Sequence, residues 1–505
     1  MTSPAAPDPL DPRVARILDK LARVRARGVA TFGAEAHGFV LAPPLAEAEV
    51  RALEAAHGIA LPEDYRTFLL QAGASGAGPY YGLLPPARWD EARVDDTADF
   101  AARPCVWEPG TPRDDETYAA RTASLDEPFQ GAIAIADQGC AYYVTLVVTG
   151  PARGRLMYVS LDGGVPFFPE NADFLSWYER WLDELLWGYT HFWYGTQMPG
   201  DEATLAEAAR ADDGPRRLDA LAAMGQLPAL SVETQAIVAR RVGDRDAPVR
   251  AAALRLARAH ALVPAIEADV RRALADDDAA VRVSALDALI AAGCAWEADA
   301  RRALGDPAEQ VVTDAVRALQ KAAAFGEADV LALLPATSAR VRATVLDVAR
   351  TVPSRAIFDA VLAIARAGDD PYDKLLLVLI AQVRHGVLDR PRLDAALAMV
   401  LARLAVATGP EAPAIAIHGL AAFVPTHPVA LARLCEVTRH AEPFFRWEAI
   451  AALASTGSAD ALPALRALVD DPAMPRAANH STAWSVGEQA RRAIERIEQA
   501  RARRS

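Results

Sequence analysis

The chain has 505 residues, of which 52% are hydrophobic and 24% are charged, and its formal net charge at pH 7 is -13. This is the composition of a globular protein and excludes a disordered, collagenous or fibrous chain. Because a protein binds a phosphate backbone through clustered cations, the acidic balance argues against a nucleic-acid-binding protein and is compatible with a cationic protein partner.

The chain changes character near residue 195. Residues 1–195 contain 25 of the 34 Phe, Trp and Tyr residues and have 16 basic against 27 acidic side chains, a net charge of -11. Residues 196–505 are dominated by Ala, Leu, Val and Arg and have 37 basic against 39 acidic side chains, a net charge of -2. Two kinds of architecture are therefore expected in one chain.

Three helices are expected at the start of the chain. Residues 11–27 and 45–57 read as helices, the first with apolar residues near helical spacing. The sequence LPEDYRTFLLQAG at 61–73 has Pro62 where a helix can begin and Gly73 where it ends. The acidic residues in its first turn suit the positive end of the helix dipole.

A loop rich in glycine and aromatic residues, ASGAGPYYGLLP, follows at residues 74–85. It lacks the third glycine of a dinucleotide-binding loop and the Lys-Ser/Thr pair of a phosphate-binding loop, and it follows a helix instead of a strand. The pattern thus argues against a nucleotide cofactor. The rings of Tyr80 and Tyr81 can pack on a sheet, and both tyrosines are also candidate partner-binding residues.

The most acidic segment spans residues 90–127, with 11 acidic side chains against 4 arginines. It has little periodicity, which predicts a long, exposed loop region. Two interpretations stay open: a solvated surface that keeps the protein soluble, or a contact surface for a basic partner. For the second, the candidate residues are Asp95, Asp96, Asp114, Asp115 and Glu116.

A β-hairpin and an amphipathic helix complete the first part. Residues 131–136 and 142–149 are rich in β-forming residues, and GPARGR after them predicts a hairpin that returns through 156–160. A helix is predicted over 171–186, because apolar residues recur on one face at Phe174, Tyr178, Trp181 and Leu185. Such a face packs on a sheet, which predicts an α+β domain with helices covering one side.

These segments, in this order, resemble the SUKH superfamily, which includes the yeast Knr/Smi regulators of cell-wall synthesis. The resemblance spans residues 30–190 and rests on LPEDYR-x-FLL, GAGPYYGLLP, ADQGC, VVTGPARGR and FLSWYERWLDELL. It implies a binding module without enzymatic activity, and bacterial relatives are associated with immunity to polymorphic toxins by direct contact. Members often carry Asn-Gly after the LPEDYR helix, whereas this chain has Ala74-Ser75-Gly76, so a contact through that Asn amide does not carry over.

The second part of the chain repeats itself. RRLDAL at residue 216 aligns with VRAAAL, VRVSAL, VVTDAV and VRATVL, which start at 249, 281, 311 and 341, in steps of 33, 32, 30 and 30. A later copy, FRWEAI, starts 104 residues beyond the last of these, at 445, and leaves room for three more units. Periods of this length indicate a solenoid of stacked helix pairs.

The repeat unit resembles a HEAT repeat over most of residues 205–500, and least clearly over 365–440. Short acids that can cap a helix precede the repeated hexapeptide at Asp246, Asp278 and Asp306. HEAT motifs pair such an Asp with an Arg in the second helix, and this Arg is matched by Arg250, Arg282, Arg342 and Arg446. Val312 takes its place in the fourth copy, which puts an unbroken ladder of Asp and Arg in doubt there.

Between the two parts lies WGYTHFWYG, residues 187–195, with five aromatic residues and one histidine. We interpret these rings as filling the seam where the last helix of the first domain meets the first repeat. A ligand cage is the alternative.

The sequence patterns typical of catalysis and metal binding are lacking. The nine histidines include no H-E-x-x-H, and no G-x-S-x-G, Walker lysine motif or paired Cys and His signature occurs. Asp137, Gln138 and Cys140 could form a small reactive site, but a Cys at the start of a strand is more often a buried small hydrophobe. We therefore expect no enzyme, no metal and no cofactor.

The cysteines and the N-terminus indicate a soluble, cytoplasmic protein. Cys105, Cys140, Cys294 and Cys435 form no C-x-x-C pair, which argues against a zinc ribbon and a disulfide framework. The N-terminus is Pro-rich and acidic, where a signal peptide would be basic and then apolar. The longest apolar run, 375–383, is shorter than the ~20 residues that span a bilayer.

Together these patterns predict a SUKH-like α+β N-terminal domain followed by an all-α solenoid of HEAT or armadillo type. The expected regions are a lead and helix over 1–29, the SUKH-like domain over 30–195 and HEAT-like repeats over 200–505. The predicted function is a non-enzymatic module that binds and neutralises a bacterial polymorphic toxin, with a basic toxin domain as partner and the repeats as scaffold. The alternative is a cytoplasmic scaffold or regulator, unrelated to toxins, whose repeats carry the main contact.

Overall fold

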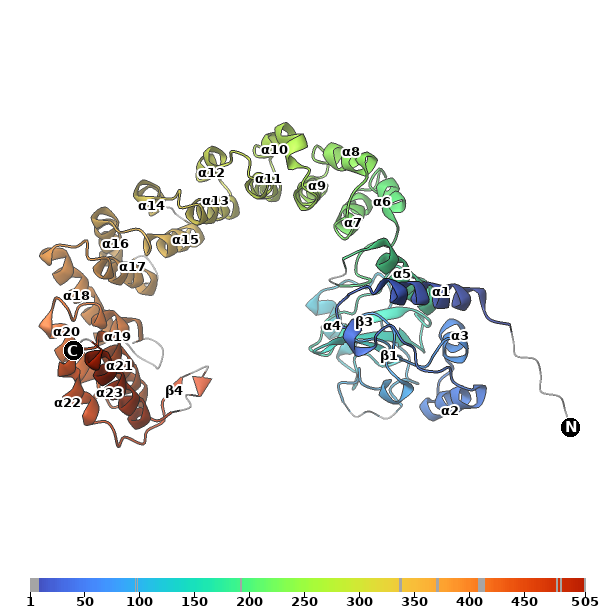
Figure 1. The fold of residues 1–505 in the computed structure, drawn as a ribbon, viewed down its shortest axis with the longest axis horizontal. Helices are drawn as coiled ribbons and strands as arrows, with labels where there is room; N and C mark the ends of the chain where they lie inside the picture. Colours follow the sequence, from blue (N-terminus) through green and yellow to red (C-terminus); the bar gives the residue numbers. More distant parts are fainter. Residues whose placement is uncertain are drawn as a thin grey trace. The chain divides into compact units, whose positions relative to one another are not determined.

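The computed structural model describes residues 9–95, 97, 99–190, 193–335, 338–368, 372–406, 414–477, 480–481 and 484–503. The chain divides into two compact units, Met1–Cys294 and Ala295–Ser505. The first unit contains an α+β domain and the first helix pairs of the repeats, and the second contains the remaining pairs (Figure 1). The predicted fold class is therefore confirmed. The predicted domain boundary near residue 195 lies inside the first unit and stays a prediction.

The α+β domain is built on a three-stranded antiparallel sheet in the order β1-β2-β3. The predicted hairpin and helices are present. A further short helix, α4, lies inside the segment 90–127, which the sequence predicted to be a loop. The strands are β1 (Ala132–Gly139), β2 (Tyr142–Val147) and β3 (Leu156–Ser160). The helices are α1 (Pro12–Arg27), α2 (Glu47–His57), α3 (Glu63–Gln71), α4 (Asp115–Thr122) and α5 (Phe174–Trp187), with single 3-10 turns η1 (Ala34–Ala36) and η2 (Pro86–Arg88).

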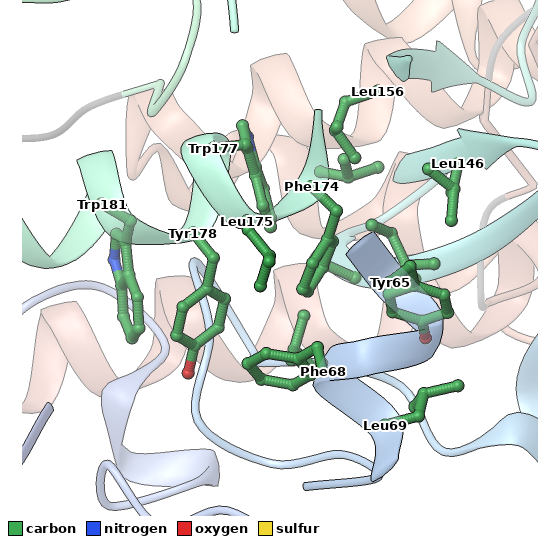
Figure 2. Packing of buried hydrophobic residues seen from close by; sticks show 14 of the residues in the cluster. Tyr65, Phe68, Leu69, Leu146, Leu156, Phe174, Leu175, Trp177, Tyr178 and Trp181 are labelled. Atoms are coloured by element: carbon green, nitrogen blue, oxygen red, sulfur yellow. The ribbon is translucent and has the colours of Figure 1, made fainter. Parts of the chain in front are cut away.

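One face of the sheet is covered by α1, α3 and α5, and the centre of this core is aromatic. Phe174, Trp177 and Tyr178 of α5 are fully buried, and the ring centroid of Phe68 from α3 lies 5.0 Å from those of Phe174 and Tyr178. Figure 2 shows these rings between the ribbon of α5 and α3. The Trp177 indole N–H donates to the hydroxyl of Tyr158 in β3 at 2.9 Å, so the buried polar atom is satisfied. The predicted amphipathic face of α5 is confirmed.

The opposite face of the sheet is covered by the segment that the sequence predicted to be an exposed acidic loop. Trp107 is fully buried there, and its indole N–H donates to the carbonyl of Pro128 at 2.6 Å. Glu127 is 1% exposed because its carboxylate accepts from the backbone N–H groups of Val94 and Asp95, at 2.9 and 2.5 Å. The prediction of an exposed loop over 90–127 is therefore wrong for these residues: the segment is a second layer whose inner side is apolar.

The repeats are pairs of antiparallel helices, and each repeated hexapeptide lies on the second helix of its pair. In the first unit the pairs are α6 (Glu202–Ala208) with α7 (Gly214–Met224), α8 (Val232–Arg241) with α9 (Ala247–Ala259), and α10 (Glu267–Ala273) with α11 (Ala279–Ala291), the last preceded by η3 (Val263–Ile266).

The second unit consists of further helix pairs. The helices are α12 (Glu297–Ala303), α13 (Glu309–Lys321), α14 (Glu327–Leu333), α15 (Ala339–Ala349), α16 (Arg355–Ala367), α17 (Tyr372–Arg384), α18 (Arg390–Ala405), α19 (Ala414–Ala421), α20 (Pro428–Val437), α21 (Pro443–Thr456), η4 (Ala459–Ala461), α22 (Leu462–Arg466) and α23 (Val486–Ala502), with a short hairpin of β4 (Arg476–Ala477) and β5 (His480–Ser481) before α23. After the hexapeptide copy that starts at residue 341, in α15, three more pairs follow, and the copy that starts at residue 445 lies in the second helix of the third pair, α21.

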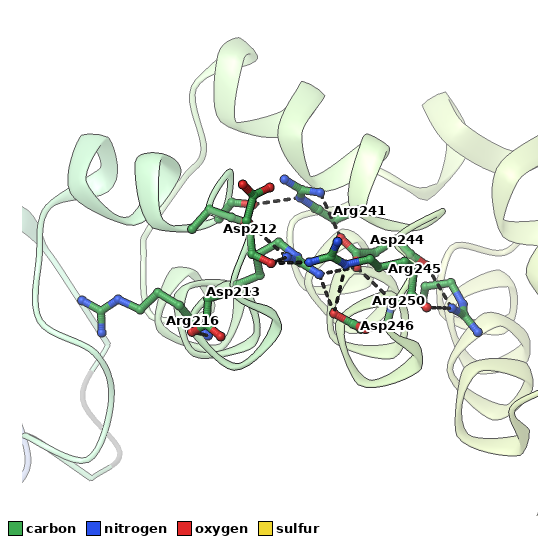
Figure 3. Close-up of polar contacts among 11 residues, drawn as sticks. Asp212, Asp213, Arg216, Arg241, Asp244, Arg245, Asp246 and Arg250 are labelled. Atoms are coloured by element: carbon green, nitrogen blue, oxygen red, sulfur yellow. Dashed lines mark hydrogen bonds and ion pairs between the residues drawn. The ribbon is translucent and has the colours of Figure 1, made fainter.

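Ion pairs between Arg and Asp connect successive repeats of the first unit. Arg217 in α7 is 2% exposed, and its guanidinium lies 2.9 Å from the carboxylate of Asp244, which is 6% exposed. Arg250 in α9 makes the next contact, at 2.7 Å from Asp276. Figure 3 shows Asp244 and Asp246 in the turn before α9, with Arg241 beside them. Arg446 and Asp471 repeat the pairing in the second unit, at 2.9 Å.

The structure corrects two details of the predicted repeat motif. Asp278 caps α11 as predicted, accepting from the N–H groups of Ala280 and Val281, but Asp246 makes no capping hydrogen bond. Its carboxylate is instead 2.5 Å from the guanidinium of Arg217, a residue that the sequence comparison of the repeats overlooked. Asp306 lies two residues before the cap of α13 and accepts from the N–H of Ala308.

The buried pair predicts a measurable loss of stability when its acid is removed. We expect Asp244→Ala to destabilise the repeats, by less than the about 3–5 kcal/mol that a fully unpaired buried charge costs, because the guanidinium of Arg217 loses its buried carboxylate but keeps the exposed one of Asp246. Chemical unfolding of the full chain, followed by circular dichroism, measures the loss. Asp277→Ala, which removes an exposed acid from the next turn, is the matched control and should leave the midpoint unchanged.

The same pair predicts a pH dependence. Burial opposes ionisation of Asp244, but hydrogen bonds from the Asp246 N–H and from Arg217 outweigh it and lower the pKa of the carboxyl. A lowered pKa contributes stability above the ordinary Asp value of about 3.9, and this contribution disappears as the pH falls through the folded value. The difference in the free energy of unfolding between the wild type and the Asp244→Ala variant should therefore shrink below about pH 4. A difference that is constant with pH would contradict this assignment.

Candidate partner-binding surface

The predicted acidic candidates that the structure describes are all exposed, and three of them lie at one end of α4. Asp114 is the N-cap of this helix, and its carboxylate accepts from the N–H of Thr117 at 2.7 Å. Asp115 and Glu116 follow in the first turn, at the positive end of the helix dipole. Asp95 lies apart, on the turn held by Glu127, and Asp96 lies outside the described residues.

The two tyrosine candidates have different environments. Tyr80 is 7% exposed, and its hydroxyl donates to the carbonyl of Tyr194 at 3.0 Å, so it belongs to the core and has no free ring face for a partner. Tyr81 is 40% exposed and packs edge-on against Phe32, with ring centroids 5.3 Å apart. Of the pair, Tyr81 remains as a candidate contact residue.

Asp114 and Asp115, at the start of α4, border a hollow of about 750 Å³ on the α+β domain, whereas Glu116 does not line it. We call it the acidic hollow and define it by Asp114, Asp115, Gln138, Tyr142, Asp162 and Trp193, which line it together with parts of β3 and the turn after it. Three carboxylates and one guanidinium, that of Arg113, line it. Arg113 lies over the ring of Phe167, 5.3 Å from its centroid. The charge of the lining is therefore negative, three acids against one base.

Gln138 enters the acidic hollow because β1 is irregular at this point. Asp137 pairs with Tyr143 and Gly139 pairs with Tyr142, so Gln138 is the extra residue of a β-bulge. The residue is 7% exposed and lines the hollow. Among the described residues, no group makes a hydrogen bond with its side-chain amide. Although the residue as a whole is mostly buried, its amide is not sealed from solvent, so it presents an acceptor oxygen and a donor NH₂ to the hollow.

Two aromatic rings form a wall of the acidic hollow. Tyr142 and Trp193 are each 40% exposed, and they meet edge-on with centroids 5.6 Å apart. Trp193 is held by the linker that follows α5: the next residue, Tyr194, is 2% exposed and its ring lies 5.6 Å from that of Trp177. The hydroxyl of Tyr194 donates to the Trp177 carbonyl. The linker thus places an exposed tryptophan beside the start of β2.

The aromatic linker at 187–195 therefore does more than fill a seam. Tyr194 packs into the core of the α+β domain, whereas Tyr189 is buried and donates to the carbonyl of Gly200 at 2.6 Å, just before the first repeat. Trp187 and Tyr189 line a second hollow of about 510 Å³ beside α6 and α8. His191 and Phe192 lie outside the described residues.

Cys140 is exposed in the turn between β1 and β2, which corrects the expectation that it is a buried small hydrophobe. It has a positive φ of 53°, so the side chain is turned out of the strand direction at the turn. Across the described ranges, no three His, Cys, Asp or Glu side chains come together as a set that could hold a metal ion.

None of the helices in the described part of the chain has the length and apolarity needed to cross a bilayer. Gln382, which interrupts the longest apolar run, is fully buried in α17. Its amide accepts from the N–H of Ser354 and donates to the carbonyls of Ala349 and Val352. It therefore connects α17 to the end of α15 and the start of α16.

Comparison with known families agrees with the architecture. Residues 44–180 match the SMI1 / KNR4 family (SUKH-1), and residues 395–500 match HEAT repeats. The resemblance predicted from the sequence is thus confirmed: the chain carries a SUKH domain followed by HEAT-like repeats. Both are protein-interaction modules. None of the curated proteins matches the sequence.

Several solved structures are similar in part. One is a crystal structure of an engineered protein, with 14% identity, a TM-score of 0.34 and coverage of 59% of this chain and 88% of the other. A crystal structure of Kap121p has 12% identity and a TM-score of 0.37, covering 59% of this chain and 37% of that one. A structure of Kap95p with RanGDP has 13% identity and a TM-score of 0.40, covering 65% of this chain and 50% of that one.

The cap of α4 predicts which acidic residue also has a structural role. Replacing Asp114 with Ala should make the amide hydrogens of α4 exchange several-fold faster, because the Thr117 N–H loses its acceptor. Asp114→Asn is the control, since an Asn side chain caps equally well. Hydrogen exchange of the peptide that covers α4 measures the effect, and equal exchange in the two variants would contradict the assigned cap.

Proposed function

We propose that the chain is an immunity-type protein: its SUKH domain binds a basic toxin domain in the cytoplasm and neutralises it by contact, without catalysis. The observation that carries the proposal is the concentration of exposed negative charge on a domain that matches the SUKH family. Residues 1–195 hold -11 of the net charge of -13. The apolar side of residues 90–127 is used to cover the sheet, so the acidic side is left to face solvent.

Charge of this kind acts mainly on the encounter between two proteins. Exposed carboxylates at the rim of an interface raise the association rate of a cationic partner and contribute less to the lifetime of the complex. The capping hydrogen bond fixes the side chain of Asp114, and the helix backbone places Asp115 and Glu116 next to it, so the three charges lie together at one end of α4.

The HEAT-like repeats are proposed to be a scaffold beside this domain. The Arg–Asp pairs between repeats add no net charge, and residues 196–505 as a whole have 37 basic against 39 acidic side chains, a net charge of only -2. The second candidate function is a scaffold or regulator unrelated to toxins, in which the repeats make the main contact. The match of residues 395–500 to HEAT repeats supports this second candidate function, so the experiment below also tests it.

The test begins with capture of a partner by the tagged full chain from an extract of the native host. The recovered protein is then expressed in cells with and without the chain. If the immunity proposal holds, it inhibits growth alone and co-expression restores growth. A recovered partner without any toxicity would contradict the immunity proposal and favour the scaffold.

The acidic surface is tested with the same partner by measuring association rates. A variant with Asp95, Asp96, Asp114 and Asp115 changed to Asn and Glu116 changed to Gln should associate about tenfold more slowly at low ionic strength. The loss should shrink as salt shortens the Debye length, which is about 10 Å at 0.1 M. The control changes five exposed acids of the repeats in the same way: Asp277, Glu297, Glu309, Glu327 and Asp470. An unchanged rate in the first variant, with a loss in the control, would place recognition on the repeats.

A further inference from the structure

The acidic hollow has three features that call for the same ligand group. Its lining is negative, it includes the amide of the mostly buried Gln138, which has no hydrogen-bond partner among the described residues, and two exposed aromatic rings line it side by side. We infer that the hollow receives an arginine side chain from the protein partner. This inference rests on the proposed role in binding a basic protein and names the place and the chemistry of that contact.

The carboxylates fit a cation that comes from outside the chain. In the part of the chain that the structure describes, Asp115 and Asp162 form no ion pair, and both are exposed. Asp114 also borders the hollow, but its carboxylate is engaged by the Thr117 N–H. The two acids without an ion pair are thus Asp115, the first residue of α4, and Asp162, in the turn after β3.

The amide of Gln138 can bind a group that donates hydrogen bonds. Gln138 is held by the β-bulge and lines the hollow, and its carbonyl oxygen can accept while its NH₂ can donate. A guanidinium has five N–H donors in one plane, so it can reach a carboxylate and an amide oxygen at the same time. A bare metal ion is a poorer fit, because the described acids do not gather into a ligand set.

The aromatic rings of the hollow favour the binding of arginine over lysine. A guanidinium is planar and weakly hydrated, so it stacks on aromatic faces such as those of Tyr142 and Trp193, whereas an ammonium is compact and strongly hydrated. The domain already shows this preference internally, since Arg113 lies over Phe167 in the same hollow. At about 750 Å³ the hollow lies within the range of about 300–1,000 Å³ typical of ligand pockets, which leaves room for the side chain and its backbone.

The experiment uses the full chain and Nα-acetyl-L-arginine N-methylamide as the probe, detected by saturation-transfer NMR of the probe. The lysine analogue and the citrulline analogue, a neutral isostere of arginine, are the comparison ligands. We expect the arginine probe to bind at least fivefold more tightly than either. Equal binding of the arginine and citrulline probes would overturn the inference, because charge would then have no role.

Variants locate the binding. The double variant Asp115→Asn, Asp162→Asn changes only exposed side chains and should weaken binding of the arginine probe at least fivefold. The control variant Asp277→Asn should leave this binding unchanged. Arg113→Gln removes the one base of the lining and should strengthen it. Gln138→Ala should weaken it as well, with its thermal unfolding measured alongside because the residue is buried. Full binding by the double variant would overturn the inference.

The outcome separates this inference from the proposed function. Arginine binding in the hollow, with no toxic partner recovered, would support the site and contradict the immunity role. A toxic partner that associates with the Asp115/Asp162 double variant at the wild-type rate and affinity would support the immunity role and contradict the site.

Discussion

The α+β domain depends on the burial of the two faces of a sheet that has only three strands. Its strands carry apolar residues on both faces, so both faces must be covered. The aromatic side of α5 covers one face, with Phe174, Trp177 and Tyr178 fully buried. Trp107 and its neighbours cover the other face. The positions of Asp114 and Asp115 and of the aromatic rings beside them follow from these two layers.

The second layer explains why negative charge gathers where it does. A segment that must be apolar inside and soluble outside places its acids on the outer side, and α4 then orders three of them at one helix end. The linker after α5 adds the aromatic wall, because the ring of Tyr194 is fixed against Trp177 and its neighbour Trp193 is left exposed. The acidic hollow is thus a by-product of core packing that a partner can use.

In the repeats, charged side chains form ion pairs between successive helix pairs. Buried ion pairs are weak as net stabilisers, because desolvation offsets the attraction, but losing one partner is expensive. The pair of Arg217 and Asp244 therefore serves best to fix how one helix pair sits on the next. Because basic and acidic residues are nearly balanced over 196–505, the repeats lack the net negative charge of residues 1–195.

Much of this architecture could be predicted from the sequence. The spacing of Phe174, Tyr178 and Trp181 gave the buried face of α5, and the repeated hexapeptides gave the second helices of the pairs. Sequence reasoning failed for residues 90–127, because the buried residues of this segment do not recur at a regular spacing. Isolated residues such as Trp107 form its inner side. Sequence reasoning named Gln138 only as part of a possible reactive site and missed the β-bulge that places it in the hollow, because a bulge is set by the register between two strands and leaves little trace in one of them.

The most direct test of the account is a hydrogen-exchange footprint of the full chain with and without its captured partner. If the SUKH domain carries recognition through the acidic hollow, the partner should slow exchange in the peptides that cover the start of α4, the turn between β1 and β2, and the end of β3. Protection confined to helices α12–α23, with none on the α+β domain, would contradict the account and assign the main contact to the repeats.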